Sequence, residues 1–178
     1  MAELSQETPM ARLNEDFPGA RRALFAKYHI GGCSSCAYSD DESIADVAKH
    51  NAFDVEEAIK HILESHAHDA EMMLTPLQAK DKIEAGAKLI DTRTREEHEA
   101  VAITGSDFMT QESQQTAFGT WDEDTVVILY DHLGDKALDT CAWFRGHGLP
   151  NTFIIQGGID AWSKEIDKSI ARYRLEME

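Results

Sequence analysis

A run of apolar and β-branched residues, Thr125-Val-Val-Ile-Leu-Tyr130, most constrains the fold of this chain. Continuous apolar strands are typical of parallel sheets, which helices cover on both faces. Similar short segments occur at Lys88-Leu-Ile-Asp91 and at Asn151-Thr-Phe-Ile-Ile155, with helical patterns between them. This alternation predicts an α/β domain over residues 72–178, with a mostly parallel sheet flanked by helices. Helical spacing of apolar residues from Lys164 to Glu178 predicts a C-terminal helix that packs on the same domain, with a partner surface as the alternative.

The first part of the chain follows a different pattern. Apolar residues recur at helical spacing across residues 1–66, and no strand pattern interrupts them. Asp41 and Asp54 stand where N-caps of two of these helices are expected. The sequence therefore predicts a small all-helical domain, joined to the α/β domain by a short polar linker at residues 67–71.

Charge and hydropathy limit the partners of the chain. A formal net charge of −16 repels phosphate backbones, so we expect no nucleic-acid partner. No run approaches the roughly 20 apolar residues that cross a bilayer, and the acidic start does not resemble a signal peptide. These features predict a cytoplasmic protein without a membrane partner.

Two motifs in the α/β part resemble the signatures of the rhodanese-like domain family. The opening motif is Leu89-Ile-Asp91-Thr-Arg93, and the closing motif is Gln156-Gly157-Gly158-Ile159-Asp-Ala-Trp162. Several motifs in one order and spacing are more specific than any single motif. The resemblance implies a rhodanese-like fold, with its active-site loop after the strand that ends at Tyr130.

That loop reads Asp131-His132-Leu133-Gly134-Asp135-Lys136. The resemblance implies a nucleophilic cysteine at the position of Asp131, a matching glycine at Gly134, and an anion-binding cation near Lys136. A thiolate attacks sulfane sulfur and holds it as a persulfide, whereas a carboxylate forms no stable equivalent. We therefore expect a degenerate loop without thiosulfate sulfurtransferase activity, and a capping role for Asp131 at the next helix.

The other candidate site is a CxxC motif in the helical part, Cys33-Ser-Ser-Cys36, which follows His29. Two intervening residues allow disulfide exchange or persulfide chemistry, and the same spacing suits half of a zinc or iron-sulfur site. His29 could join such a half-site, and a homodimer could complete it. A structural role is the third reading. Cys141, the remaining cysteine, is expected in the core.

The segment around this pair resembles the hybrid-cluster-protein-associated redox disulfide domain. The resemblance implies a redox-active or sulfur-carrying role for Cys33 and Cys36, and a protein partner in sulfur, redox or iron-sulfur pathways. The leading hypothesis is a non-catalytic rhodanese-like protein with such a pair. Two alternatives remain: a sulfurtransferase that uses Cys33 or Cys36 as its persulfide carrier, and a purely binding or regulatory module.

Overall fold

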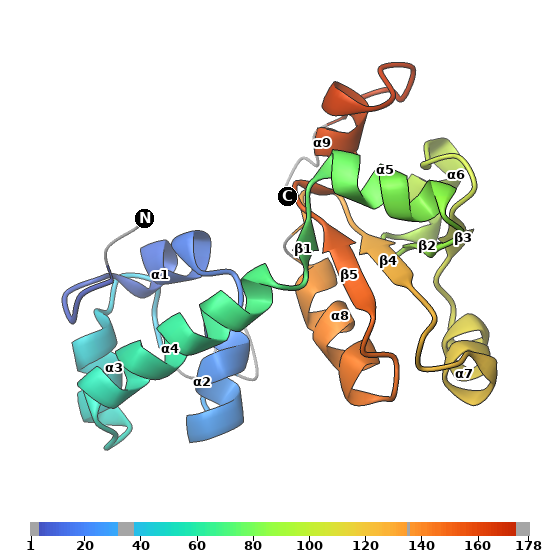
Figure 1. Cartoon of the computed structure of the whole chain (residues 1–178). Coiled ribbons are helices and arrows are strands. Elements are labelled where there is room, and N and C mark those ends of the chain that lie inside the picture. The colour runs from blue at the N-terminus through green and yellow to red at the C-terminus, as the bar shows by residue number, and fades with distance from the viewer. Residues whose placement is uncertain (1–3, 32–37, 135, 174–178) are drawn as a thin grey trace. The chain divides into compact units, whose positions relative to one another are not determined.

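The computed structural model describes residues 4–31, 38–134 and 136–173. The chain divides into two compact units, Met1–Glu71 and Met72–Glu178, which are described separately (Figure 1). Cys33 and Cys36 lie outside the described residues, as does Asp135. In the part that the structure covers, no helix is both long and apolar enough to cross a membrane.

The described part of the first unit contains helices and no strand longer than one isolated bridge, in line with the predicted helical domain. Its helices are α1 (Met10–Asp16), α2 (Ala20–Tyr28), α3 (Ile44–His50) and α4 (Val55–Ala70). They share one apolar core, whose largest fully buried side chains are those of Met10, Leu13, Leu24, Ile44 and Ile62. The Asp54 side chain accepts from the backbone N–H of Glu57 and caps α4, as expected. The predicted cap at Asp41 is wrong, because Ser43 caps α3 in a reciprocal pair with Asp46.

The prediction of a linker at residues 67–71 is also wrong, because α4 continues as far as Ala70. Asp69 is buried, and its carboxylate is ion-paired with Arg22 of α2. This pairing holds the polar last turn of α4 against its own unit. The two partners are 47 positions apart, so local sequence pattern could not reveal the contact.

The second unit contains a five-stranded sheet in which every pair is parallel. Its strands are β1 (Met73–Leu74), β2 (Lys88–Asp91), β3 (Asp107–Phe108), β4 (Val127–Tyr130) and β5 (Thr152–Ile155). The spatial order is β1-β5-β4-β2-β3, and the ladder of β2 with β4 aligns Asp91 with Tyr130. The predicted parallel α/β architecture is confirmed. The loops after β2, β4 and β5 therefore lie at one edge, where ligand sites of such sheets form.

Helices cover both faces of this sheet (Figure 1). They are α5 (Pro76–Glu84), α6 (Arg95–Ala100), α7 (Gln111–Thr120), α8 (Ala137–Gly146) and α9 (Gly158–Glu165). Side chains of β4 alternate between two cores. Val127 and Leu129 pack with residues of α7 and α8, whereas Ile128 and Tyr130 pack with residues of α5 and α9. Burial on both faces accounts for the uninterrupted apolar run in the sequence.

Within the described residues, the predicted C-terminal helix is wrong beyond Glu165, where α9 ends, because residues 167–173 are not helical; residues 174–178 lie outside the described residues. Asp167 accepts hydrogen bonds from the backbone and hydroxyl of Ser169, which form a turn in place of a further helical turn. Ile166 and Ile170 nevertheless pack into the core beside α9. The expected packing of this segment on its own domain is therefore confirmed.

Candidate functional site

Asp131 follows β4 directly, and only 4% of its surface is exposed. One carboxylate oxygen accepts the backbone N–H of Gly134, and the other accepts that of Ala137 at 2.8 Å. Ala137 is the first residue of α8. The carboxylate therefore caps this helix, and it satisfies amide groups that a helix N-terminus otherwise offers to an anion.

Two glycines hold this loop against the turn between β5 and α9. A Cβ atom on Gly134 would lie 2.7 Å from the backbone nitrogen of Gly157, and one on Gly158 would lie 2.5 Å from the carbonyl oxygen of Asp131. Both glycines also have positive φ angles, 87° and 55°. The backbone N–H of Ile159 donates to the Asp131 carbonyl at 2.9 Å, so α9 fastens the loop directly. This close approach explains Gly158 of the closing motif, whereas a Cβ atom on Gly157 would lie 2.6 Å from Cβ of Ala161 in α9.

The other residues of the loop differ in exposure. His132 is partly buried, whereas Leu133 exposes 55% of its surface and Lys136 is exposed. Trp162 of the closing motif is buried in the core that α5 and α9 share, where it supports the first turns of α9. The structure thus brings the loop and the closing motif together, while Trp162 has a packing role.

Asp91 and Arg93 of the opening motif form a buried ion pair at the end of β2. Two guanidinium nitrogens of Arg93 donate to the two carboxylate oxygens of Asp91, at 2.9 and 2.6 Å. The hydroxyl of Tyr130 donates to the same carboxylate at 2.9 Å, and Nδ1 of His98 lies 2.9 Å from it. Burial alone would raise the pKa of Asp91, but the hydrogen bonds from Arg93 and His98 outweigh burial and lower that pKa. The carboxylate of Asp91 links the end of β2 to β4 through the hydroxyl of Tyr130.

Tyr173 joins the opening motif to the loop, and sequence reasoning did not identify it as a site residue. Its hydroxyl accepts from Nη1 of Arg93 at 2.6 Å and donates to Glu97 at 2.6 Å. Its ring packs against the imidazole of His132, with centroids 4.5 Å apart. The partners of the hydroxyl are 80 and 76 positions away, so no local pattern signals these contacts.

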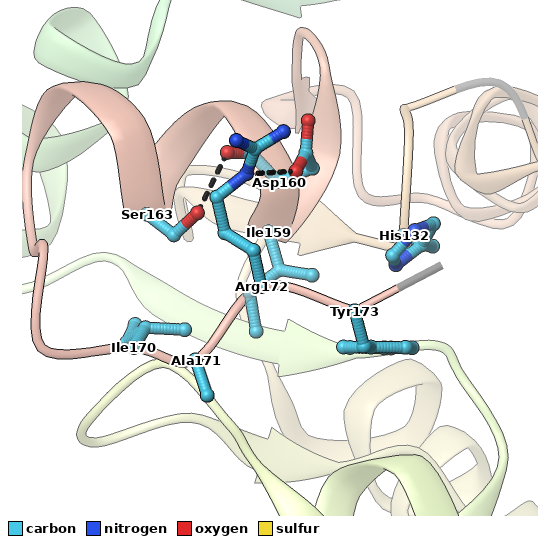
Figure 2. Close-up of a pocket in the computed structure, with 8 residues that line it drawn as sticks. All are labelled: His132, Ile159, Asp160, Ser163, Ile170, Ala171, Arg172 and Tyr173. Carbon is cyan, nitrogen blue, oxygen red and sulfur yellow. Dashed lines mark hydrogen bonds and ion pairs between the residues drawn. The ribbon is translucent and has the colours of Figure 1, made fainter. Parts of the chain in front are cut away.

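A shallow pocket lies where residues 167–173 return to the loop (Figure 2). It is lined by His132, Ile159, Asp160, Ser163, Ile170, Ala171, Arg172 and Tyr173. Nε of Arg172 lies 2.7 Å from Asp160 of α9. A dashed line marks this ion pair in Figure 2. The returning segment therefore forms part of the wall beside the loop.

Of the three cysteines, Cys141 lies within the described residues. Cys141 is fully buried in α8, and its thiol donates to the carbonyl of Thr152 at 3.2 Å, so its expected core position is confirmed. His29 ends α2 with a left-handed backbone, φ 59°. Cys33 and Cys36 lie outside the described residues, so the half-site of these three residues stays a prediction. No cluster of three or more metal-ligating side chains occurs in the described ranges.

Comparison with known proteins identifies the class. The model of the rhodanese-like domain family matches residues 75–165, just over half of the chain. The matched range includes the opening motif, the loop and the closing motif. The chain therefore belongs to the rhodanese-like domain family.

Individual relatives match this same part. "Probable adenylyltransferase/sulfurtransferase MoeZ" of Mycobacterium tuberculosis is 27% identical over 104 residues, which are 56% of this chain and 26% of the relative. "Rhodanese-like/PpiC domain-containing protein 12, chloroplastic" of Arabidopsis thaliana is 31% identical over 97 residues, 49% of this chain and 30% of the relative. The chain thus matches between a quarter and a third of the length of these curated relatives.

Among solved structures, a protein of Staphylococcus saprophyticus subsp. saprophyticus aligns with a TM-score of 0.45 and 18% identity. The alignment covers 56% of this chain and 98% of that protein.

Proposed function

We propose that this is a non-catalytic rhodanese-like protein in which Cys33 and Cys36 carry redox or persulfide chemistry, within sulfur or iron-sulfur metabolism. The observation that carries the first half of the proposal is the buried carboxylate of Asp131. It accepts the backbone N–H groups of Gly134 and Ala137 from its own loop. We therefore assign this loop a structural and recognition role.

The chemistry of the loop supports this assignment. The resemblance to active rhodaneses assigns the position of Asp131 to a thiol nucleophile, and a carboxylate does not carry sulfane sulfur. The same carboxylate supplies negative charge where thiosulfate would have to bind, and it occupies two amide donors. Cys141, the described cysteine, is buried in the core with its thiol directed to Thr152, so it is a poor substitute.

The second half of the proposal rests on the spacing and setting of the Cys pair. Two cysteines separated by two serines suit disulfide exchange and sulfur transfer, and the reducing cytoplasm that we propose would keep them available. The name of the mycobacterial relative includes sulfurtransferase activity, which supports a place in sulfur metabolism. A protein partner, recognised by the rhodanese-like domain, would supply or receive the sulfur or electrons.

Three alternatives give different results in simple assays. If the protein is itself a sulfurtransferase, Cys33 or Cys36 would be the persulfide carrier, and turnover would depend on it. If the protein is a pure binding module, a Cys33→Ser/Cys36→Ser variant would keep full function. A metal half-site of these cysteines with His29, shared between two copies of the chain, would instead bind zinc or an iron-sulfur cluster.

A thiosulfate:cyanide assay tests the assignment of the loop. We expect the wild-type chain to show background turnover, because the loop lacks a thiolate. The Asp131→Cys variant is tested in the same assay. A gain of activity in this variant would show that the rest of the loop can still bind the substrate. Wild-type turnover above background that is lost in Cys33→Ser or Cys36→Ser would overturn the non-catalytic proposal and establish the sulfurtransferase alternative.

A further inference from the structure

The ring of Tyr173 occupies a slot formed by side chains of three separate elements. His132 comes from the loop after β4, Arg93 follows β2, and Glu97 lies in α6. We infer that these three side chains form a binding site for a hydroxylated aromatic ring, and that Tyr173 is its resident occupant. Residues 167–173, named the strap here, deliver that ring and thereby cover the loop.

The slot is specific for a phenol because the hydroxyl of the bound ring must accept one hydrogen bond and donate another. Nη1 of Arg93 is a donor only, and the carboxylate of Glu97 is an acceptor, so the group between them must accept and donate. Both hydrogen bonds measure 2.6 Å. Burial and the hydrogen bond to Glu97 raise the pKa of Tyr173 to about 12, which keeps the hydroxyl proton in place. A phenylalanine ring would fill the space but leave both groups without this bridge.

The faces of the ring are recognised as well. The imidazole of His132 lies 4.5 Å from the ring of Tyr173 between centroids, and the guanidinium of Arg93 lies 6.0 Å from the ring centre. Figure 2 shows His132 and Tyr173 facing one another. Nδ1 of His132 is buried and has no hydrogen-bond partner among the described residues. The slot therefore keeps one polar group that a ligand larger than tyrosine could engage.

Besides the contacts of Tyr173 itself, two side chains attach the strap to the described remainder of the unit, and we expect its occupancy of the slot to be reversible. Ile170 is anchored in the core with 8% of its surface exposed, and Arg172 pairs with Asp160 at 2.7 Å. Residues 167–173 belong to no helix or strand, so no ladder of backbone hydrogen bonds holds them. Withdrawal of Tyr173 would uncover His132. Filling of the slot, by Tyr173 or by another phenol, would control access to the loop.

Modification of His132 by diethyl pyrocarbonate tests the site in the full-length chain, with labelling followed peptide by peptide by mass spectrometry. In Tyr173→Ala we expect the rate at His132 to rise by about tenfold or more, because this variant loses the ring that packs on the imidazole together with hydrogen bonds to charged groups, one of which alone shifts an equilibrium by about that factor. Added p-cresol should restore protection, whereas toluene should not. Exposed His50 serves as the internal reference for reagent activity.

Two further variants separate the slot from general loosening. Tyr173→Phe keeps the ring and should give an intermediate rate at His132, and Lys168→Ala, at an exposed position of the strap, should leave the rate unchanged. The inference is overturned if His132 is labelled equally in wild type and Tyr173→Ala, or if toluene protects as well as p-cresol. If Tyr173→Ala does not fold, a wild-type rate in Tyr173→Phe overturns it. This test does not depend on the chemistry of Cys33 and Cys36.

Discussion

Replacement of Asp131 by alanine should destabilise the rhodanese-like unit, because its carboxylate holds the start of α8. The N-cap residue of α8 is Lys136, but Asp131 supplies the capping acceptor for the amide of Ala137, and loss of a capping side chain costs about 0.5–2 kcal/mol. Each buried amide that loses its acceptor costs about 1–3 kcal/mol more, and here the amides of Gly134 and Ala137 are affected. Since these costs overlap and water can replace one bond, we expect a loss of about 2–4 kcal/mol in the free energy of unfolding.

Urea unfolding followed by tryptophan fluorescence measures this change in the correct unit. Trp121, Trp143 and Trp162 all lie within Met72–Glu178, and they are the three tryptophans of the chain. Asp124→Ala is the matched control, since it removes the same charge from an exposed position and should change stability by about 0.5 kcal/mol or less. A loss in Asp131→Ala no larger than in this control would refute a structural role for the carboxylate.

Three other perturbations test the packing around the site. Gly134→Ala should cost about 3 kcal/mol or more, against about 1 kcal/mol for Gly105→Ala, because both have positive φ but only the former meets backbone atoms within 3 Å. Hydrogen bonds from Arg172 and Lys164 lower the pKa of Asp160 to about 2. The charged Asp160 should therefore stabilise the fold fully at pH values above its ordinary pKa of 3.8, and this stabilisation should be lost as the pH falls toward 2. Cys141 should resist alkylation in the folded protein, and Cys141→Ala should cost about 1 kcal/mol.

The same fluorescence assay decides the first two of these. Equal losses for the two glycine variants would show that the loop yields to a Cβ atom without cost. For the acid dependence, the midpoint difference between wild type and Asp160→Asn should be present at about pH 5 and shrink below about pH 4. If the midpoint difference between wild type and Asp160→Asn were constant with pH, the ion pair of Asp160 with Arg172 would not contribute to stability. Peptide mapping after iodoacetamide treatment checks Cys141, and rapid labelling in the native state would contradict its burial.

The sequence predicted the sheet well because its strands are buried on both faces. Burial on both faces gives an uninterrupted apolar pattern at Thr125–Tyr130 and Asn151–Ile155. This pattern can be recognised without knowledge of contacts to distant residues. The position of Asp131 between strand and helix also predicted its capping role, which depends on neighbours within six residues. Local chemistry was sufficient in these cases.

Long-range contacts decided the features that the sequence did not predict. Asp69 extends α4 through its pairing with Arg22, so a polar stretch that looked like a linker is helical. Ile166, Ile170 and Tyr173 have helical spacing, yet the turn at Asp167 directs the segment back to the loop. The slot for Tyr173 is built from side chains far apart in the chain, and only the folded arrangement brings them together.

We propose that the Cys pair, and not the rhodanese-like loop, carries the chemistry. Intact mass of the anaerobically purified protein, native and denatured, before and after treatment with a persulfide donor, tests it most directly. We expect added sulfur, or a reversible loss of two hydrogens, that disappears in Cys33→Ser and in Cys36→Ser. A native mass with bound metal that is lost on denaturation would establish the metal half-site instead. An unchanged mass in every state would contradict the claim and leave a binding module.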